Sequence, residues 1–247
     1  MKILISPAKK MRVEEELFPW RELPAFLPKA ERLMEFVQGL SYGEAKKLWA
    51  CNDAIAELNF GRFRRMDLKQ RLTPALFSYE GIQYQYLAPR VLEDQALEYL
   101  QEHLRILSGF YGVLRPFDGV TPYRLEMQAK AQVDGCRDLY EFWGGDLAKA
   151  VTADSRELLN LASKEYAKAV EAWMEPGIRE VTCIFGEWVK GQVIQKGTKA
   201  KMARGEMVRF LAERNAAAME EAKDFDRLGY RYRRELSSET EWVFLLE

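Results

Sequence analysis

The strongest constraint on the fold lies at residues 103–127, where a periodic apolar pattern runs into a dense series of turn-forming residues. Before it, leucines recur at the spacing of one buried helix face: Leu97, Leu100, Leu104 and Leu107. Asp94 suits an N-cap and Gly109 a C′ position, so the pattern predicts a helix over about residues 94–108. The chain must then turn repeatedly, at Gly112, Pro116, Gly119 and Pro122. Long ordered loops of this kind are usually functional.

The composition indicates a globular protein of one large domain, which we place at residues 1–247. The net charge of −1 gives no strong positive field, so any contact with nucleic acid needs a local basic patch. No apolar run approaches the roughly 20 residues that span a bilayer. Three widely spaced cysteines favour a cytoplasmic protein without disulfides: Cys51, Cys136 and Cys183.

A single histidine, His103, excludes most catalytic triads and any metal site that needs two histidines. The sequence contains no GxxxxGKS, no GxGxxG after a strand and no HExxH. Iron could bind only through carboxylates, and no spacing suggests such a site. We therefore expect no metal site, no cofactor and no membrane partner.

Periodicity predicts a mixture of strands and helices. We expect strands at residues 2–6, 75–87, 157–161, 180–189, 191–196, 228–234 and 241–246, with Lys190-Gly191 as a hairpin turn. We expect helices at residues 29–40, 42–59, 138–151, 165–173 and 198–214, and an irregular loop at residues 12–28. These elements predict an α/β or mixed α+β fold: a single compact domain with a mixed sheet.

Charged residues follow the first strand at Lys9 and Lys10. In α/β proteins ligands collect beyond the carboxyl ends of strands, so both lysines are well placed to bind an anion. The alternative is that they are solvated loop residues. Further along, Arg124 and Glu126 share one face of an extended segment, where they could form a structural pair or hold a polar ligand.

Several of these residues are candidates for acid–base chemistry. We take Glu126, Asp138 and Glu165 as possible acids or bases, with Lys9 and Arg124 as groups that stabilise an anion.

Basic residues are concentrated in three runs, at residues 62–71, 190–214 and 231–234. Acidic runs at residues 14–16, 93–102, 220–226 and 235–241 compensate for them. Basic runs are commonly solvated surfaces, but they could also form a positive cleft for nucleic acid. On the helix at residues 198–214, Lys199, Lys201 and Arg209 fall opposite the apolar stripe and Arg204 lies at its boundary.

The segment at residues 107–112 is similar to the turn of a helix-hairpin-helix, in which glycine N–H groups contact a DNA phosphate. Gly109 and Gly112 would make these contacts. The match departs from that motif in two ways: two residues separate the glycines instead of one, and Pro116 interrupts the second helix.

Six sequence blocks together resemble the YaaA family of bacterial peroxide-stress proteins. They are ISPAKKM, HLRILSGFYGVLRPFDGVTPYRLEM, DLYEFWG, LLNLASKEY, KMARGEMVRF and GYRY, in that order over essentially the whole chain. The resemblance implies a family-specific cytoplasmic α/β fold with a basic cleft and a DNA-binding helix-hairpin-helix-like element. It also implies protection of DNA and lowered free iron under hydrogen peroxide. Matching positions include Ser6, Lys9, Arg105, Gly109, Gly112, Arg115, Arg124, Glu126, Lys130, Asp138, Ser163, Arg204 and Arg209.

Two functions remain open from the sequence. The first is binding of double-stranded DNA, independent of base sequence, through Lys9, Lys10, Arg105, Gly109, Gly112, Arg115, Arg124, Lys130, Lys199, Lys201, Arg204 and Arg209. The second is an enzyme that acts on a nucleotide, a nucleobase or another small anionic molecule, with consumption of peroxide as one option. Carboxylates such as Glu126 and Asp138 favour the second, because phosphate binding does not require them, although they could also orient arginines.

Overall fold

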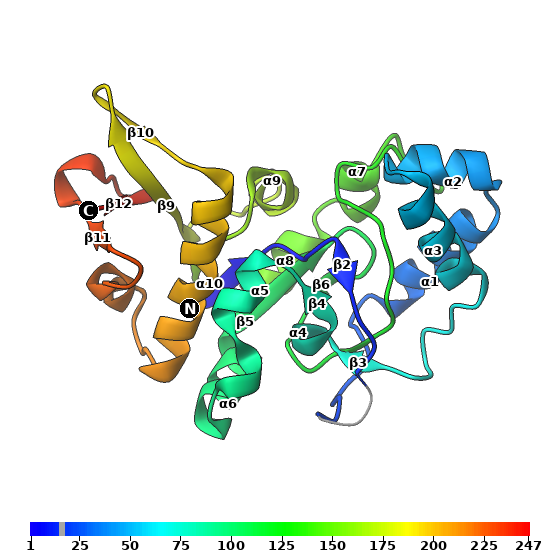
Figure 1. The fold of residues 1–247 in the computed structure, drawn as a ribbon, viewed down its shortest axis with the longest axis horizontal. Coiled ribbons are helices and arrows are strands. Elements are labelled where there is room, and N and C mark those ends of the chain that lie inside the picture. The colour runs from blue at the N-terminus through cyan, green and yellow to red at the C-terminus, as the bar shows by residue number, and fades with distance from the viewer. Residues whose placement is uncertain (15–17) are drawn as a thin grey trace.

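The computed structural model describes residues 1–14 and 18–247, and Figure 1 shows the course of the chain. Within these residues, eight strands form one mixed sheet in the order β11-β12-β9-β8-β1-β5-β6, with β10 paired to β9. The strands are β1 (Lys2–Ile5), β5 (Leu104–Ser108), β6 (Gly112–Leu114), β8 (Glu157–Asn160), β9 (Arg179–Val189), β10 (Gln192–Ile194), β11 (Tyr230–Tyr232) and β12 (Glu241–Leu246). The strands from β12 to β5 run parallel, whereas β6, β10 and β11 pair antiparallel.

Helices and two short ladders complete the fold. The α-helices are α1 (Leu27–Gln38), α2 (Tyr42–Trp49), α3 (Asp53–Arg64), α4 (Ala75–Ser78), α5 (Ile82–Leu87), α6 (Asp94–His103), α7 (Leu139–Trp143), α8 (Asp146–Thr152), α9 (Lys164–Glu171) and α10 (Gly197–Glu213). The 3₁₀ turns are η1 (Pro89–Val91), η2 (Met219–Asp224) and η3 (Arg234–Leu236). In the ladders, β2 (Lys10–Met11) pairs with β4 (Tyr79–Glu80), and β3 (Thr73–Pro74) pairs with β7 (Gly119–Val120).

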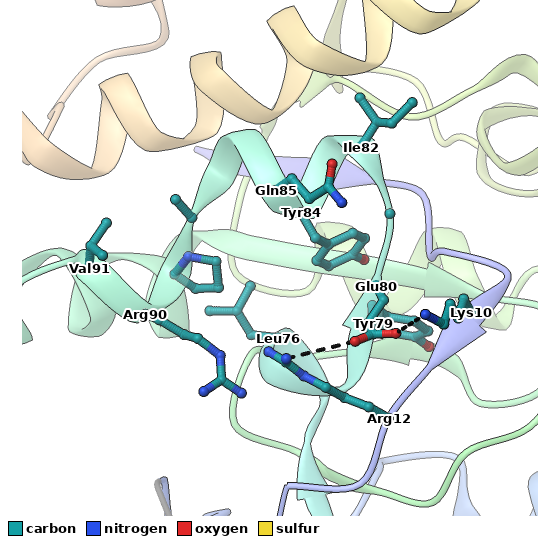
Figure 2. A pocket seen from close by; sticks show the side chains of 13 residues that line it. Lys10, Arg12, Leu76, Tyr79, Glu80, Ile82, Tyr84, Gln85, Arg90 and Val91 are labelled. Carbon is teal, nitrogen blue, oxygen red and sulfur yellow. Dashed lines mark ion pairs between the residues drawn. The ribbon is translucent and has the colours of Figure 1, made fainter.

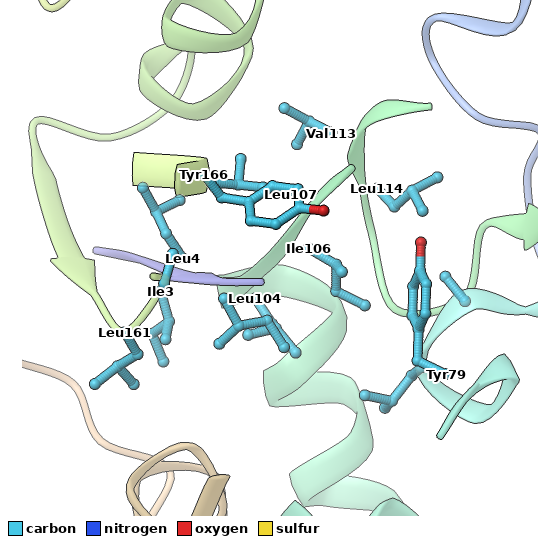
Figure 3. Close-up of a cluster of buried hydrophobic side chains, with 14 of the residues drawn as sticks. Ile3, Leu4, Tyr79, Leu104, Ile106, Leu107, Val113, Leu114, Leu161 and Tyr166 are labelled. Carbon is cyan, nitrogen blue, oxygen red and sulfur yellow. The ribbon is translucent and has the colours of Figure 1, made fainter. Parts of the chain in front are cut away.

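The core lies on both faces of the sheet because successive residues of a strand point to opposite sides. Figure 3 shows Leu4 and Leu107 on the side of Tyr166, which belongs to α9. Ile3 and Leu104 point to the other side. All four aliphatic side chains are fully buried. Both faces of the two central strands are therefore buried, so their apolar residues occur at consecutive positions and not only at alternate ones.

The chain connections that leave β1 and β8 run to opposite sides of the sheet. These strands are neighbours, yet β1 leads to β5 on one side and β8 leads through α9 to β9 on the other. Ligands of α/β proteins bind where connections part in this way, beyond the carboxyl ends of the strands.

Most of the elements predicted at the two ends of the chain are confirmed. The strands at residues 2–6 and 157–161 are β1 and β8, which pair in parallel. The turn at Lys190 and Gly191 has φ angles of 50° and 81° and joins β9 to β10. The basic helix is α10, whose predicted apolar stripe is buried.

The helix predicted over residues 94–108 is too long, because α6 ends at His103 and Leu104–Ser108 forms β5. Every residue of β5 is buried. A strand buried on both faces has no alternation that would distinguish it from a helix, so Leu104 and Leu107 continued the helical spacing by coincidence. The helix-hairpin-helix turn predicted at residues 107–112 is therefore wrong: Gly109 lies in the turn of a β-hairpin between β5 and β6, and Gly112 is the first residue of β6, paired with Ser108.

Three further boundaries differ from the predictions. The segment at residues 75–87, predicted as a strand, forms α4, β4 and α5 instead. It contains only one β-branched residue, Ile82, so little in its composition favours a strand. The helix predicted at residues 42–59 breaks at Ala50, whose φ is 45°, and Asn52 caps α3. The helix predicted at residues 138–151 is divided at Gly144 into α7 and α8.

The predicted loop at residues 12–28 ends earlier than expected, because α1 begins at Leu27 with Pro28 in its first turn, where proline is tolerated. Residues 15–17 of this loop, and with them part of the acidic run at 14–16, lie outside the described residues. Among the residues that the structure describes, no helix has the length and apolar character needed to cross a membrane.

Candidate functional site

A cleft of about 1130 Å³ lies beside Lys9, four residues beyond the carboxyl end of β1. We call it the Lys9 cleft. One wall comes from α1 and α2, and the other comes from the segment at residues 124–138. Its charged lining residues are Lys9, Lys47, Arg124, Lys130 and Arg137, together with Glu44, Glu126 and Asp138. Five basic and three acidic side chains give the lining a formal charge of +2.

Glu126 is held between two cations in this cleft. Lys9 Nζ lies 2.5 Å from Glu126 Oε2, and Arg124 Nη2 lies 3.0 Å from Glu126 Oε1. The side chains of Arg124 and Glu126 are only 11% and 16% exposed, whereas that of Lys9 is 63% exposed. The predicted pairing of Arg124 with Glu126 is thus confirmed, and Lys9 is the member of the group that an incoming anion can reach.

A second group of polar residues lies where β1 and β8 part. Ser6 follows β1 and Ser163 precedes α9; their Oγ atoms are 3.2 Å apart, and Ser163 N donates to Ser6 Oγ at 2.8 Å. Glu165 accepts from Gln128 N at 3.2 Å. Burial raises the pKa of Glu165, the bond from Gln128 N opposes the rise and nearby Glu126 adds to it. Glu165 is therefore the carboxyl group at this edge best suited to hold a proton.

The hairpin between β5 and β6 fixes the position of the Arg124–Glu126 segment. A Cβ on Gly109 would lie 2.6 Å from Leu125 O and 2.9 Å from Met127 N, so only glycine permits this close approach. Ser108 Oγ accepts from Tyr111 N at 2.8 Å and lies 2.6 Å from Tyr123 Oη.

Gly109 and Gly112 are both buried, so the structure does not place their N–H groups where a DNA phosphate could reach them. Their role in this fold is local packing: Gly109 lies against the segment at residues 125–127, and Gly112, with a φ of 78°, packs against Trp143.

Asp138 lies in the cleft as the N-cap of α7 and accepts from Glu141 N at 3.0 Å. This backbone hydrogen bond is the main reason that the pKa of Asp138 is lowered. A carboxylate held in its charged form by a cap is a poor general acid. Asp138 is thus better suited to ordering the α7 end of the cleft.

The other predicted anion-binding residues lie elsewhere. Lys10 does not line the Lys9 cleft but a separate pocket of about 540 Å³, where it and Arg12 pair with Glu80 (Figure 2). Arg105 and Arg115 line pockets beside α6, near the amino ends of β1 and β5.

On α10 most of the predicted basic residues already have partners or are shielded. Lys199 pairs with Glu187 at 2.7 Å, and Arg209 pairs with Glu213 at 2.7 Å. Arg204 packs beside the buried Cys183, and burial lowers its pKa. Lys201 is exposed.

Sequence reasoning missed Lys47, Trp49 and Arg137 as lining residues. Trp49 is 3% exposed, and its Nε1 has no acceptor among the described residues; the same is true of Arg124 Nε. Buried donors are normally paired, so two orphans in one cleft favour a ligand that carries acceptor atoms. Nothing local in the sequence marks Trp49, which is brought to Arg124 only by the packing of α2.

No group of three or more histidine, cysteine, aspartate or glutamate side chains within residues 1–14 and 18–247 is arranged to hold a metal ion.

The fold and the cleft define an α/β protein with a charged cleft beyond the carboxyl end of its first parallel strand. A family model described as peroxide stress protein YaaA matches residues 1–236. The chain is 51% identical over 245 residues to a UPF0246 protein of Desulfitobacterium hafniense, covering 99% of this chain and 98% of that protein. A UPF0246 protein of Lachnoclostridium phytofermentans is 54% identical over 245 residues, covering 99% and 96%. The chain therefore belongs to the YaaA family of peroxide stress proteins.

Proposed function

We propose that this peroxide stress protein binds DNA through the Lys9 cleft, and that it limits DNA damage and free iron under hydrogen peroxide. The observation that carries the proposal is the set of exposed cations on the cleft: Lys9, Lys47, Lys130 and Arg137. Within the described part of the chain, Lys47 and Lys130 form no ion pair, so their charge is available to phosphates. Such contacts release counterions, which supplies most of the affinity of sequence-independent binding.

The basic surface of α10 is the competing interface. Two of its lysines, Lys196 and Lys199, share one carboxylate, Glu187, at 2.6 and 2.7 Å, whereas the exposed Lys201 forms no ion pair with the described residues. Binding DNA there would require these pairs to be broken or shared. Among the described residues, the cleft therefore offers two lysines without an ion pair, Lys47 and Lys130, whereas α10 offers one, Lys201.

The proposal can be tested by fluorescence anisotropy with a labelled duplex. The Lys9→Gln/Lys130→Gln variant should bind about 10-fold more weakly or worse, because each lost phosphate contact removes the release of about one counterion. The matched Lys199→Gln/Lys201→Gln variant removes the same charge from α10 and should lose less than about 3-fold. A larger loss for the α10 variant would move the interface to that helix. Absence of binding by the wild type would refute the DNA proposal.

A second candidate function is an enzyme that acts on a nucleotide or a similar small anion. The specific support is the pair of orphaned donors, Trp49 Nε1 and Arg124 Nε, in a cleft that also contains Glu126. Glu165, with its raised pKa, lies close enough to Glu126 to be influenced by its charge. Mononucleotides that compete with the duplex for the cleft and are converted to new products would favour this function over simple DNA binding.

A further inference from the structure

Arg105 is a buried cation with no counter-charge of its own. It lies in β5 and is 6% exposed. Its Nη1 donates to the backbone carbonyls of Leu104 at 2.8 Å and Gln101 at 3.3 Å. Across the residues that the structure describes, its guanidinium takes part in no ion pair. A buried charge destabilises the fold unless a partner compensates it, so this arrangement needs an explanation.

Three carboxylates attract Arg105 without forming an ion pair with it: Asp154, Asp118 and the largely exposed Glu102. Asp154 lies 2.8 Å from Lys2 Nζ, and Lys2 itself is buried. Asp118 accepts from Arg115 N at 2.8 Å, and burial raises the pKa of Asp118 to about 7, so it carries only part of a charge at neutral pH. Arg115 also repels Arg105, which adds to the lowering of the Arg105 pKa by burial. The lining of the larger pocket is formally balanced, with Lys2, Arg105 and Arg115 against Glu98, Glu102 and Asp154, so attraction for an anion must come from the unpaired guanidinium edge of Arg105.

One edge of the Arg105 guanidinium makes no hydrogen bond to the described chain, and Arg105 lines two pockets. Since Nη1 makes the two carbonyl contacts, Nε and Nη2 remain without acceptors from the described chain. These two N–H groups form the planar fork that binds a carboxylate or a phosphate bidentately. Arg105 lines two adjoining pockets of about 530 and 330 Å³, which also share Arg115 and Asp154.

We propose that this hollow, between α6, β5 and the end of α8, binds a small organic oxyanion through bidentate contact with Arg105. Lys2 also lines the larger pocket but pairs with Asp154 at 2.8 Å, and Arg115 lies at the more exposed side. A volume of about 530 Å³ is in the usual range for small-molecule sites, so it accepts more than a bare ion. The ligand class is a phosphate monoester or a carboxylate. The site is separate from the Lys9 cleft and does not depend on DNA binding.

Thermal shift and calorimetric titrations can test this site with three probes at matched ionic strength: inorganic phosphate, succinate and chloride. Phosphate, succinate or both should bind saturably and raise the Tm, and the stronger of the two identifies the headgroup. Chloride should not. Arg105→Gln should abolish the effect, and Arg105→Lys should weaken binding about 10-fold, because an ammonium group cannot form the fork. Arg124→Gln, which removes an arginine of the Lys9 cleft, should not remove the effect, and Arg234→Gln, which removes an exposed arginine outside both sites, should leave it unchanged.

Two results would overturn the proposal: no saturable binding of phosphate or succinate, or binding that Arg124→Gln removes and Arg105→Gln preserves. If Arg105→Gln does not fold, Arg115→Gln provides the test, because this residue is half exposed and its loss should weaken the same binding several-fold. Binding unchanged by both Arg105→Lys and Arg115→Gln would also contradict the assignment.

Discussion

Replacing Gly109 by alanine distinguishes packing from phosphate contact at this residue. The added Cβ would lie 2.6 Å from Leu125 O, 2.9 Å from Glu126 C and 2.9 Å from Met127 N. All three are backbone atoms, and Cβ atoms almost never approach others within 3.0 Å, so the segment must move by at least about 0.4 Å. Overpacking of this kind costs about 1–3 kcal/mol, and lower entropy of the unfolded alanine chain offsets about 0.4–1 kcal/mol of it.

The expected net loss of about 1–2 kcal/mol corresponds to a fall in Tm of about 2–8 °C for a chain of this size. Circular dichroism melting and urea titration would measure it. Gly43→Ala is the matched control: it lies in α2 with open space around its Cβ, so it should stabilise the protein by up to about 1 kcal/mol. If Gly109→Ala left stability unchanged but weakened DNA binding, the packing explanation would be wrong and a phosphate contact by Gly109 would be favoured.

Two other substitutions test the packing and the electrostatics of the fold. Gly205→Ala should destabilise the protein by about 3 kcal/mol or more, because its Cβ would lie 2.0 Å from Gln83 O where α10 crosses α5. The control Gly197→Ala lies in open space on the same helix and should not destabilise it. Equal urea midpoints for the two variants would refute the packing explanation. Asp118→Asn tests the raised pKa of Asp118, which is about 7 in the folded state and near 3.9 in the unfolded state. Between these pH values the folded state binds more protons than the unfolded state. The free energy of unfolding of the wild type therefore falls as pH rises through this window. The decline is at most about 4 kcal/mol and should be largely absent in Asp118→Asn; parallel pH profiles of the two proteins would contradict it.

Local patterns were sufficient for elements with a clear signature. The strand at residues 2–6 is bounded by Pro7, and the basic helix at residues 198–214 shows its apolar stripe in the sequence. The residues of β5 could not be assigned in this way, because a central strand with both faces buried has no polar alternation.

The candidate site was only partly predictable. Lys9, the Arg124–Glu126 pair and Asp138 were chosen for separate local reasons, and Lys130 was chosen through the family resemblance; all five line one cleft. Lys47 and Trp49 reach this cleft through the packing of α2 against distant segments, which no local pattern records. Gly109 was noticed for its spacing, but its role depends on contact with residues 125–127, and this contact is visible only in three dimensions.

The most direct test of the DNA proposal is the salt dependence of duplex binding by the wild type and by Lys9→Gln/Lys130→Gln. A plot of log K against log salt should be linear and steep for the wild type, with a slope of about −0.9 for each phosphate neutralised. The double variant should have a slope shallower by nearly 2, because two phosphate contacts are lost. Equal slopes for the two proteins would show that these lysines do not contact the backbone and would contradict the proposed cleft interface.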